Sequence, residues 1–207
     1  MGRKIKLEDI SAIILAGGKG LRMGRDKASL PLLNETLLEH LAHQLDGHFK
    51  EIIISVSRGQ RYPEISFTQV EDEFEDKGPL SGILSGLNRI SSDVAFIVAC
   101  DHPEIDLKIV EQMLTRIEGY DLVYLLLAGC LPHPLFALYR PAVVPVIKKL
   151  IEENKLGVLE LLDRVKAASL SVPSEKLLWN LNTPEDYERY LEFLKKNPKK
   201  SKFFKFF

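Results

Sequence analysis

Near the start of the chain, residues 13–27 read IILAGGKGLRMGRDK, a short apolar run followed by a loop rich in glycine and in basic residues. Glycines let backbone N–H groups approach a ligand, and basic side chains neutralise the charge of a phosphate. A buried strand that leads into such a loop is where α/β proteins hold phosphates. The stretch therefore predicts an α/β fold with an anion-binding loop after its first strand.

Two common phosphate-binding motifs do not fit this loop. No Gly-Lys-Ser/Thr follows four residues after a glycine, which excludes a Walker A loop, and Met23 stands where the dinucleotide fingerprint needs its third glycine. An ordinary strand-to-helix turn is the plainer alternative. Such a turn does not need the two arginines and two lysines of residues 18–27, so phosphate binding is the better interpretation.

The pattern L-A-G-G-x-x-x-R-M-G-x-D-K resembles the signature loop of the molybdenum cofactor guanylyltransferase (MobA) family of nucleotidyltransferases. Sugar-nucleotide pyrophosphorylases carry a looser version, and the Arg-Met-Gly-x-Asp-Lys ending is typical of the MobA group. The resemblance implies nucleotide binding along residues 15–18, the first three at the base, and phosphate contacts from two basic side chains. These residues are Leu15, Ala16, Gly17 and Gly18, with Arg22 and Lys27 at the phosphates.

Length and charge limit the remaining possibilities. The 207 residues suit one domain, which we expect over residues 1–196, followed by a basic and aromatic tail over residues 197–207. The net charge of −1 gives no general affinity for nucleic acid or for an anionic membrane. No signal peptide, no apolar run of about 20 residues and no disulfide framework is visible, so we expect a cytoplasmic protein without stable membrane association.

Apolar runs typical of strands alternate with segments of helical spacing along the whole chain. This alternation predicts βαβ units and a mostly parallel twisted sheet with helices on both faces, with ligands at the carboxyl ends of the strands. Together with the resemblance, it implies a single-domain, three-layer α/β/α Rossmann-like nucleotidyltransferase fold. The predicted strands are residues 10–15, 51–56, 67–70, 94–99, 122–127, 135–139 and 168–172, and the predicted helices are residues 37–45, 80–90, 107–117, 141–151, 156–164 and a last one from 184.

The segment after the third predicted strand combines an acidic run with Gly78-Pro79-Leu80. Glycine permits an unusual backbone angle and proline suits the first position of a helix, whose amides then face the cleft. The segment resembles the family's G-P-L-x-G motif at the nucleotide base, and Asp72 matches a position that touches the nucleotide. Ser55 stands where the family often has a nucleotide-binding asparagine. We expect the other acids of the run to be solvated surface.

A fourth predicted strand delivers Asp101 to the same edge of the sheet, in the sequence Cys100-Asp101-His102-Pro103. Magnesium takes one or two carboxylates together with phosphate oxygens and waters. A turn-forming aspartate before proline is the alternative. The resemblance to the family's C-D-x-P favours a Mg²⁺ ligand at Asp101. We expect His102 to be structural or solvent-facing, and Cys100 to be a buried apolar residue.

Two later motifs complete the resemblance and imply the binding site of the second substrate. Residues 134–139 resemble the family's P-L-F-A-L-Y strand, with His133 beside it as a plausible contact of the pterin. Asn180 and Asn182 precede Thr183-Pro184-Glu185 and resemble the N-x-N-T-P-E motif. The asparagines could instead satisfy only the turn backbone. The family order of the five motifs favours the binding of the acceptor.

The ordered set of motifs implies transfer of GMP from GTP to the terminal phosphate of molybdopterin, with release of pyrophosphate. It implies Arg22, Lys27 and Asp101 as catalytic residues, Mg²⁺ as cofactor, and molybdoenzymes or cofactor-biosynthesis proteins as possible partners. Two alternatives stay open: a cytidylyl- or sugar-nucleotide transferase of the same fold, and a non-catalytic nucleotide-binding carrier. Mere binding does not need the metal ligand, so the three catalytic residues argue against the carrier.

Overall fold

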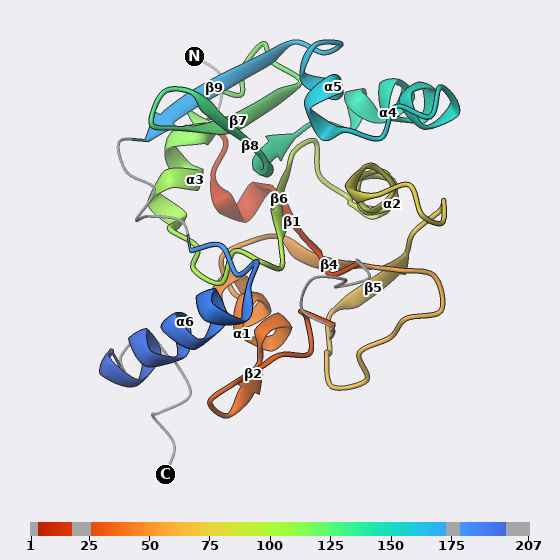
Figure 1. Ribbon diagram of the computed structural model, residues 1–207. Coiled ribbons are helices and arrows are strands. Elements are labelled where there is room, and N and C mark those ends of the chain that lie inside the picture. The colour runs from red at the N-terminus through yellow and green to blue at the C-terminus, as the bar shows by residue number, and fades with distance from the viewer. Residues whose placement is uncertain (1–3, 18–25, 173–178, 198–207) are drawn as a thin grey trace.

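The computed structural model describes residues 4–17, 26–172 and 179–197. Its centre is a seven-stranded sheet in the order β5-β4-β1-β6-β8-β7-β9, with a separate two-stranded hairpin, β2-β3 (Figure 1). The strands are β1 (Ser11–Leu15), β2 (Pro31–Leu32), β3 (Glu35–Thr36), β4 (Glu51–Val56), β5 (Thr68–Glu71), β6 (Ala95–Ala99), β7 (Leu122–Leu127), β8 (Leu131–Tyr139) and β9 (Ala167–Val172).

Helices cover both faces of this sheet. Helices α2, α4 and α5 lie on one face, and α1, α3 and α6 lie on the other (Figure 1). The α-helices are α1 (Leu37–Leu45), α2 (Pro79–Arg89), α3 (Leu107–Leu114), α4 (Val144–Glu152), α5 (Val158–Leu162) and α6 (Pro184–Lys196), and short 3₁₀ helices span Leu7–Asp9 and Pro141–Val143. The predicted three-layer α/β/α fold is confirmed.

The sheet is mostly parallel, as the alternation of strands and helices predicts. Strand β1 runs parallel to β4 and β6, β4 runs parallel to β5, and β7 runs parallel to β9. Strand β8 is antiparallel to both of its neighbours, β6 and β7. Every residue of β1 and β6 is buried, because helices cover both faces of the central strands.

Two elements differ from the sequence prediction. The β2-β3 hairpin was not predicted, because strands of two residues are too short to show a period. Strand β8 begins at Leu131 instead of residue 135. Pro132 and Pro134 argue against a strand. Residues 131–133 nevertheless pair with β7 beyond an irregularity in the register at Tyr124/Leu125, and Pro134 lies within that irregularity.

A buried polar cluster attaches the last helix to the first. His40 of α1 donates through Nδ1 to Glu35 at 2.8 Å, and its Nε2 lies 3.1 Å from the hydroxyl of Tyr190 on α6. That hydroxyl in turn donates to Glu104 at 2.9 Å. Buried polar groups are stable when they are hydrogen-bonded, so the cluster fixes α6 against the loop that follows β6.

Helix α2 packs closely on the sheet through a glycine. A Cβ atom added at Gly86 would lie 2.7 Å from Cγ2 of Ile13, at the buried centre of β1. We expect Gly86→Ala to lower the free energy of unfolding by about 1–2 kcal/mol, because overpacking outweighs the roughly 1 kcal/mol gained in helix propensity. Urea unfolding measures this change. Asn88→Ala on the exposed face of α2 is the control, and no loss of stability is expected there; an unchanged Gly86→Ala protein would contradict the close packing.

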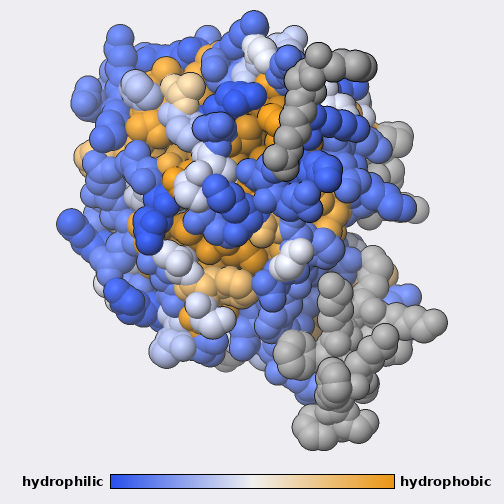
Figure 2. Space-filling model, turned by 180° about the vertical axis from the view of Figure 1, so that it is seen from behind, coloured by the Kyte–Doolittle hydropathy of each residue, from blue (hydrophilic) through white to orange (hydrophobic). Residues whose placement is uncertain are grey.

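Polar side chains cover most of the face shown in Figure 2, with hydrophobic ones visible between them over the middle of the molecule. Among the residues that the structure describes, the exposed large hydrophobic ones are Leu33, Tyr120, Leu131 and Leu159. None of the helices in the described ranges combines the length and the apolarity needed to cross a membrane.

Candidate functional site

The carboxyl ends of four parallel strands meet at one edge of the sheet. Gly17 follows β1, Ser57 follows β4, Asp72 follows β5 and Asp101 follows β6. Backbone hydrogen bonds hold these loops together, among them one from Asp72 N to the Val56 carbonyl at 2.9 Å. The candidate residues therefore lie where open α/β sheets place their ligands.

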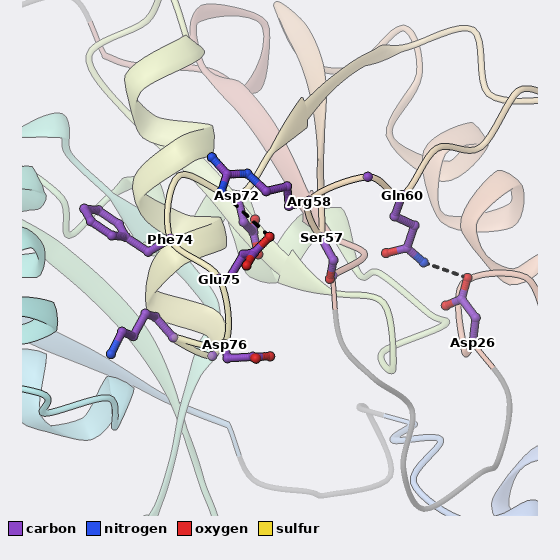
Figure 3. A pocket seen from close by; sticks show the side chains of 12 residues that line it. Asp26, Ser57, Arg58, Gln60, Asp72, Phe74, Glu75 and Asp76 are labelled. Atoms are coloured by element: carbon purple, nitrogen blue, oxygen red, sulfur yellow. Dashed lines mark hydrogen bonds and ion pairs between the residues drawn. The ribbon is translucent and has the colours of Figure 1, made fainter.

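A pocket of 890 Å³ opens at this edge, between the loops that follow β1, β4 and β5 (Figure 3). Its volume is in the range of sites for small-molecule ligands. Figure 3 shows the side chains of the loops after β4 and β5 on opposite sides of the pocket. The pocket is lined by Gly17, Asp26, Ser57, Arg58, Gly59, Gln60, Asp72, Phe74, Glu75, Asp76, Lys77 and Gly78.

Of the three residues predicted at the nucleotide base, Gly17 lines this pocket. Leu15 and Ala16 are buried, and their polar backbone atoms already have partners. The Ala16 amide donates to the Ser55 carbonyl at 2.8 Å, and the Ala16 carbonyl accepts from the hydroxyl of Tyr62 at 3.3 Å. A Cβ atom at Gly17 would lie 3.2 Å from both Asp72 Oδ2 and Ser57 N, so a side chain there would fill the floor of the pocket.

Ser55 and Asp72 form a polar pair behind the pocket. The Ser55 hydroxyl, itself buried, donates to Asp72 Oδ1 at 2.8 Å. Burial raises the pKa of the Asp72 carboxyl, and the hydrogen bond from Ser55 acts in the opposite direction. A Cβ atom at Gly82 would lie 2.8 Å from Ser55 Oγ. The glycine thus lets α2 approach the pair. Ser55 does not line the pocket, and its hydroxyl contacts Asp72, which does.

Gly78 adopts the backbone conformation that its sequence context suggests. Its φ of 62° lies in the left-handed region that glycine tolerates best. It is the residue before α2, and Pro79 opens that helix. The N-terminal amides of α2 therefore begin at the wall of the pocket, where they favour a negatively charged or electron-rich ligand.

Asp26 is a pocket residue that the sequence did not identify. Its Oδ2 accepts hydrogen bonds from Tyr62 at 2.8 Å and from Gln60 at 3.0 Å, both in the loop between β4 and β5. Its Oδ1 accepts from the amide of Ala28 at 3.1 Å. These bonds attach the end of the basic loop to the β4–β5 loop. No motif marks this role, because the partners lie more than 30 residues apart in sequence.

The mouth of the pocket is charged. Arg58 and Glu75 point toward each other across it, with Arg58 Nη1 3.7 Å from Glu75 Oε1 (Figure 3). The two side chains are 60% and 61% exposed, so solvent weakens their attraction. The sequence prediction placed Glu75 and Asp76 only on the solvated surface. That prediction is incomplete, because the turn after β5 also brings both residues to the pocket wall.

A second group of predicted residues lies outside this pocket and is held together by Lys27. Its Nζ donates to Oδ1 of Asn182 at 3.0 Å and lies 3.8 Å from Oδ2 of Asp101. The side chains of Lys27 and Asp101 are 19% and 25% exposed. The structure therefore brings together one residue of the basic loop, the carboxylate after β6, and one amide of the last motif.

The segment before α6 docks directly on the turn that carries Asp101. The amide of Leu181 donates to the backbone carbonyl of Asp101 at 2.8 Å. The neighbouring side-chain oxygen of Asn180 is buried and has no hydrogen-bond partner within the described part of the chain. Thr183 caps α6 by accepting from the amide of Asp186. Of the two asparagines, Asn182 thus has a side-chain bond outside its own turn, to Lys27.

His102 is buried, with a side chain only 4% exposed. The prediction of a structural or solvent-facing residue is right in its first part, because Nδ1 of His102 donates to the carbonyl of Trp179 at 3.1 Å. The ring also packs edge-on against His133 and Phe136 of β8, with ring centroids 5.9 Å and 6.2 Å away. His133, on the antiparallel strand β8, therefore lies beside the turn that carries Asp101.

Cys100 is unsuited to be a nucleophile. Burial raises the pKa of its thiol to about 12, and the negative charge of Asp101 adds to this effect. The thiol is therefore protonated at neutral pH. The residue is partly buried and packs against the core, so the prediction of a buried apolar residue holds only in part.

The side-chain oxygen atoms of Asp101 and Asn182, the two residues that Lys27 contacts, fit a divalent cation. Oδ1 of Asp101 is buried and has no hydrogen-bond partner among the described residues, and oxygen donors are those that Mg²⁺ prefers. Those residues contain no cluster of three His, Cys, Asp or Glu side chains suited to a metal. An ion bound here would thus complete its coordination with amide, substrate and water oxygens. Gly18, Arg22 and the tail over residues 198–207 lie outside the described residues.

Comparison with known proteins identifies a matching family. The family model of the MobA-like NTP transferase domain matches residues 12–179. A probable molybdenum cofactor guanylyltransferase of Carboxydothermus hydrogenoformans is 31% identical over 193 residues, which cover 90% of this chain and 97% of that protein. A molybdenum cofactor guanylyltransferase of Syntrophotalea carbinolica is 34% identical over 188 residues, 87% of this chain and 90% of that protein.

A solved structure shares the fold. The molybdopterin-guanine dinucleotide biosynthesis protein A of Archaeoglobus fulgidus superposes with a TM-score of 0.75 and 21% identity, over 90% of this chain and 100% of that chain. At this identity the similarity concerns the fold alone.

Proposed function

Since the chain belongs to the MobA-like NTP transferase family, and is thus a nucleotidyltransferase, we propose that it transfers GMP from GTP to the terminal phosphate of molybdopterin. Pyrophosphate is released, and the product is the guanine dinucleotide form of the cofactor. The named activities of the two relatives support this reaction. The observation that carries the proposal is the contact of Lys27 with both Asp101 and Asn182, since it joins the predicted phosphate, metal and acceptor residues.

The reaction suits a site without an activated nucleophile. The attacking atom is a phosphate oxygen of the acceptor, which is already ionised at neutral pH, and the leaving group is pyrophosphate. Catalysis then requires in-line positioning and the neutralisation of charge. Lys27 supplies a fixed positive charge beside Asp101, and the sequence places Arg22 in the same loop.

In this proposal the pocket and the region around Asp101 each bind one of the two substrates. We assign the nucleotide to the pocket of Gly17, Asp72 and Gly78, with Ser55 holding the Asp72 carboxyl. We assign the acceptor to the region of His133, Asn180 and Asn182, beside the turn of Asp101. We assign Lys27, which contacts Asp101 and Asn182, to the place where the α-phosphate of the nucleotide and the acceptor phosphate must meet.

We assign Mg²⁺ to Asp101, whose buried Oδ1 has no hydrogen-bond partner among the described residues and is suited to hold it. When bound, the ion would neutralise the charge that develops on the phosphate oxygens. Lys27 approaches the other carboxylate oxygen of Asp101, and so keeps the carboxylate oriented. Cofactor-biosynthesis proteins or molybdoenzymes that take up the product would be its partners.

The test is pyrophosphate release from each of GTP, CTP, ATP and UTP in the presence of Mg²⁺ and molybdopterin. Release with GTP alone is expected. Release with CTP alone would contradict the assignment of guanine while keeping the phosphate site. Absence of release with all four nucleotides, together with calorimetric binding of GTP, would contradict the enzymatic function and favour a carrier.

A further inference from the structure

The side-chain amide of Gln60 is held in one orientation at the wall of the pocket. Its Nε2 donates to Oδ2 of Asp26 at 3.0 Å and to the hydroxyl of Tyr62 at 2.6 Å, which uses both amide protons. With the amide turned the other way, Oε1 would face the Asp26 carboxylate at that 3.0 Å with no proton between the two acceptors. The hydrogen-bond network therefore fixes which atom is the nitrogen.

Tyr62 supports this orientation from the interior of the protein. Its side chain is buried, and its hydroxyl lies 2.8 Å from Oδ2 of Asp26 and 3.3 Å from the Ala16 carbonyl. Both of these oxygens only accept, so the hydroxyl oxygen is left to accept from Gln60. Gln69 holds the backbone of Tyr62 by accepting from its amide at 3.0 Å and donating to its carbonyl at 2.8 Å. The ring that orients Gln60 is thus fixed itself.

This arrangement leaves Oε1 of Gln60 to a ligand. Among the described residues, the hydrogen bonds of this side-chain amide all involve its nitrogen. Figure 3 shows the nitrogen turned to Asp26 and the oxygen on the other side, toward Ser57 and the interior of the pocket. An acceptor that is oriented before a ligand binds loses little entropy on binding, and it favours a ligand with a donor at that place.

The charges of the pocket indicate which part of a nucleotide lies against this wall. The described lining carries more carboxylates than cationic side chains, namely Asp26, Asp72, Glu75 and Asp76 against Arg58 and Lys77. Carboxylates repel phosphate groups. The wall therefore suits the base and the sugar, which carry N–H and O–H donors, better than the triphosphate.

We infer that Oε1 of Gln60 accepts a hydrogen bond from the 2-amino group of guanine and so helps to select GTP. This inference rests on the nucleotide assignment of the proposed function. The hydroxyl of Tyr62 contacts both the Gln60 amide and the carbonyl of Ala16, so Gln60 lies beside the residues predicted at the base. Gln60 is then a specificity-determining residue, and Tyr62 is a positioning residue that acts through it.

An acceptor at this place distinguishes guanine from the other three bases. Guanine is the only one of the four with an amino group at the 2-position, where the pyrimidines carry an oxygen that would repel Oε1. Inosine triphosphate lacks only this amino group. One neutral hydrogen bond corresponds to about a tenfold change in affinity, so we expect the unchanged protein to bind inosine triphosphate about tenfold more weakly than GTP.

Calorimetric binding to the full chain, with Mg²⁺ and without the acceptor, tests the contact independently of turnover. The ligands are GTP, inosine triphosphate and 2′-deoxy-GTP. Gln60→Met is expected to weaken GTP binding about tenfold and to leave the binding of inosine triphosphate nearly unchanged. Tyr62→Phe keeps the ring and removes one of the two bonds of the amide, and we expect it to lower the preference for GTP over inosine triphosphate about threefold. Gln112→Met, on the exposed face of α3, is the matched control without effect.

The three ligands separate the possible failures. Equal weakening of GTP and inosine triphosphate by Gln60→Met would show that Gln60 only supports the pocket, and would overturn the inference while leaving the proposed function intact. If 2′-deoxy-GTP alone became insensitive to Gln60→Met, Gln60 would contact the ribose hydroxyl instead of the base. An unchanged preference in Tyr62→Phe would contradict the positioning role of Tyr62. If the unchanged protein did not bind GTP at all, the assignment of the nucleotide to this pocket would fall as well.

Discussion

Asp101→Asn is expected to reduce turnover by at least about a hundredfold, because removing one group that stabilises charge in the transition state costs about 10²–10³ in kcat. The substitution keeps the size of the side chain and removes its negative charge. The fold is expected to persist, because Leu181 is held by the backbone carbonyl of Asp101 and not by its side chain. Lys27 keeps its hydrogen bond to Asn182.

The measurement is pyrophosphate release at saturating GTP and molybdopterin, over a range of Mg²⁺ concentrations. Asp93→Asn provides the matched control, because this exposed aspartate lies just before β6, at the opposite edge of the sheet. Its activity is expected to be unchanged. If Asp101→Asn retained more than about a tenth of the turnover and the same Mg²⁺ dependence, Asp101 would not hold the ion.

Lys27→Met is expected to reduce turnover by about a hundredfold as well. The methionine preserves most of the apolar length of the side chain and removes the ammonium group that approaches Asp101 and Asn182. Two effects combine: the phosphates lose a fixed positive charge, and the amide of Asn182 loses its donor at 3.0 Å. We therefore expect kcat to fall and the KM values of both the acceptor and GTP to rise.

Steady-state kinetics with each substrate varied in turn separates these constants. Lys108→Met, an exposed lysine in the first turn of α3, is the control for the loss of one positive charge. The double variant with Asp101→Asn is informative, because residues that act as a unit are not additive. A double variant as slow as the slower single variant is expected. Fully multiplied losses would contradict a shared role.

Most of the fold could be predicted because its signals are local. The runs at residues 51–56 and 122–127 are mostly apolar, and the structure has strands with those bounds. The early part of β8 could not be predicted, because its pairing with β7 depends on a neighbour in space and its prolines argue against it. Strand order likewise depends on packing between distant segments.

The same distinction applies to the site. The backbone preferences of Gly78 and Pro79 alone predict the start of α2. Asp26 belongs to the quoted loop motif, but its hydrogen bonds to Gln60 and Tyr62 could not be predicted, since they link two loops distant in sequence. The contact of His102 with Trp179 is also invisible in sequence, because 77 residues separate the partners.

The position of β8 has a consequence for the order of folding during synthesis. All strands of the β5-β4-β1-β6 half lie within residues 11–99, whereas the other half lies within residues 122–172. A nascent chain can thus assemble its first four strands early, but β6 then remains an open edge. Strand β7 emerges before β8 yet cannot pair with β6, so the edge is closed only when β8 inserts between them. A ribosome pause between residues 99 and 139 would therefore prolong exposure of an apolar edge to other chains.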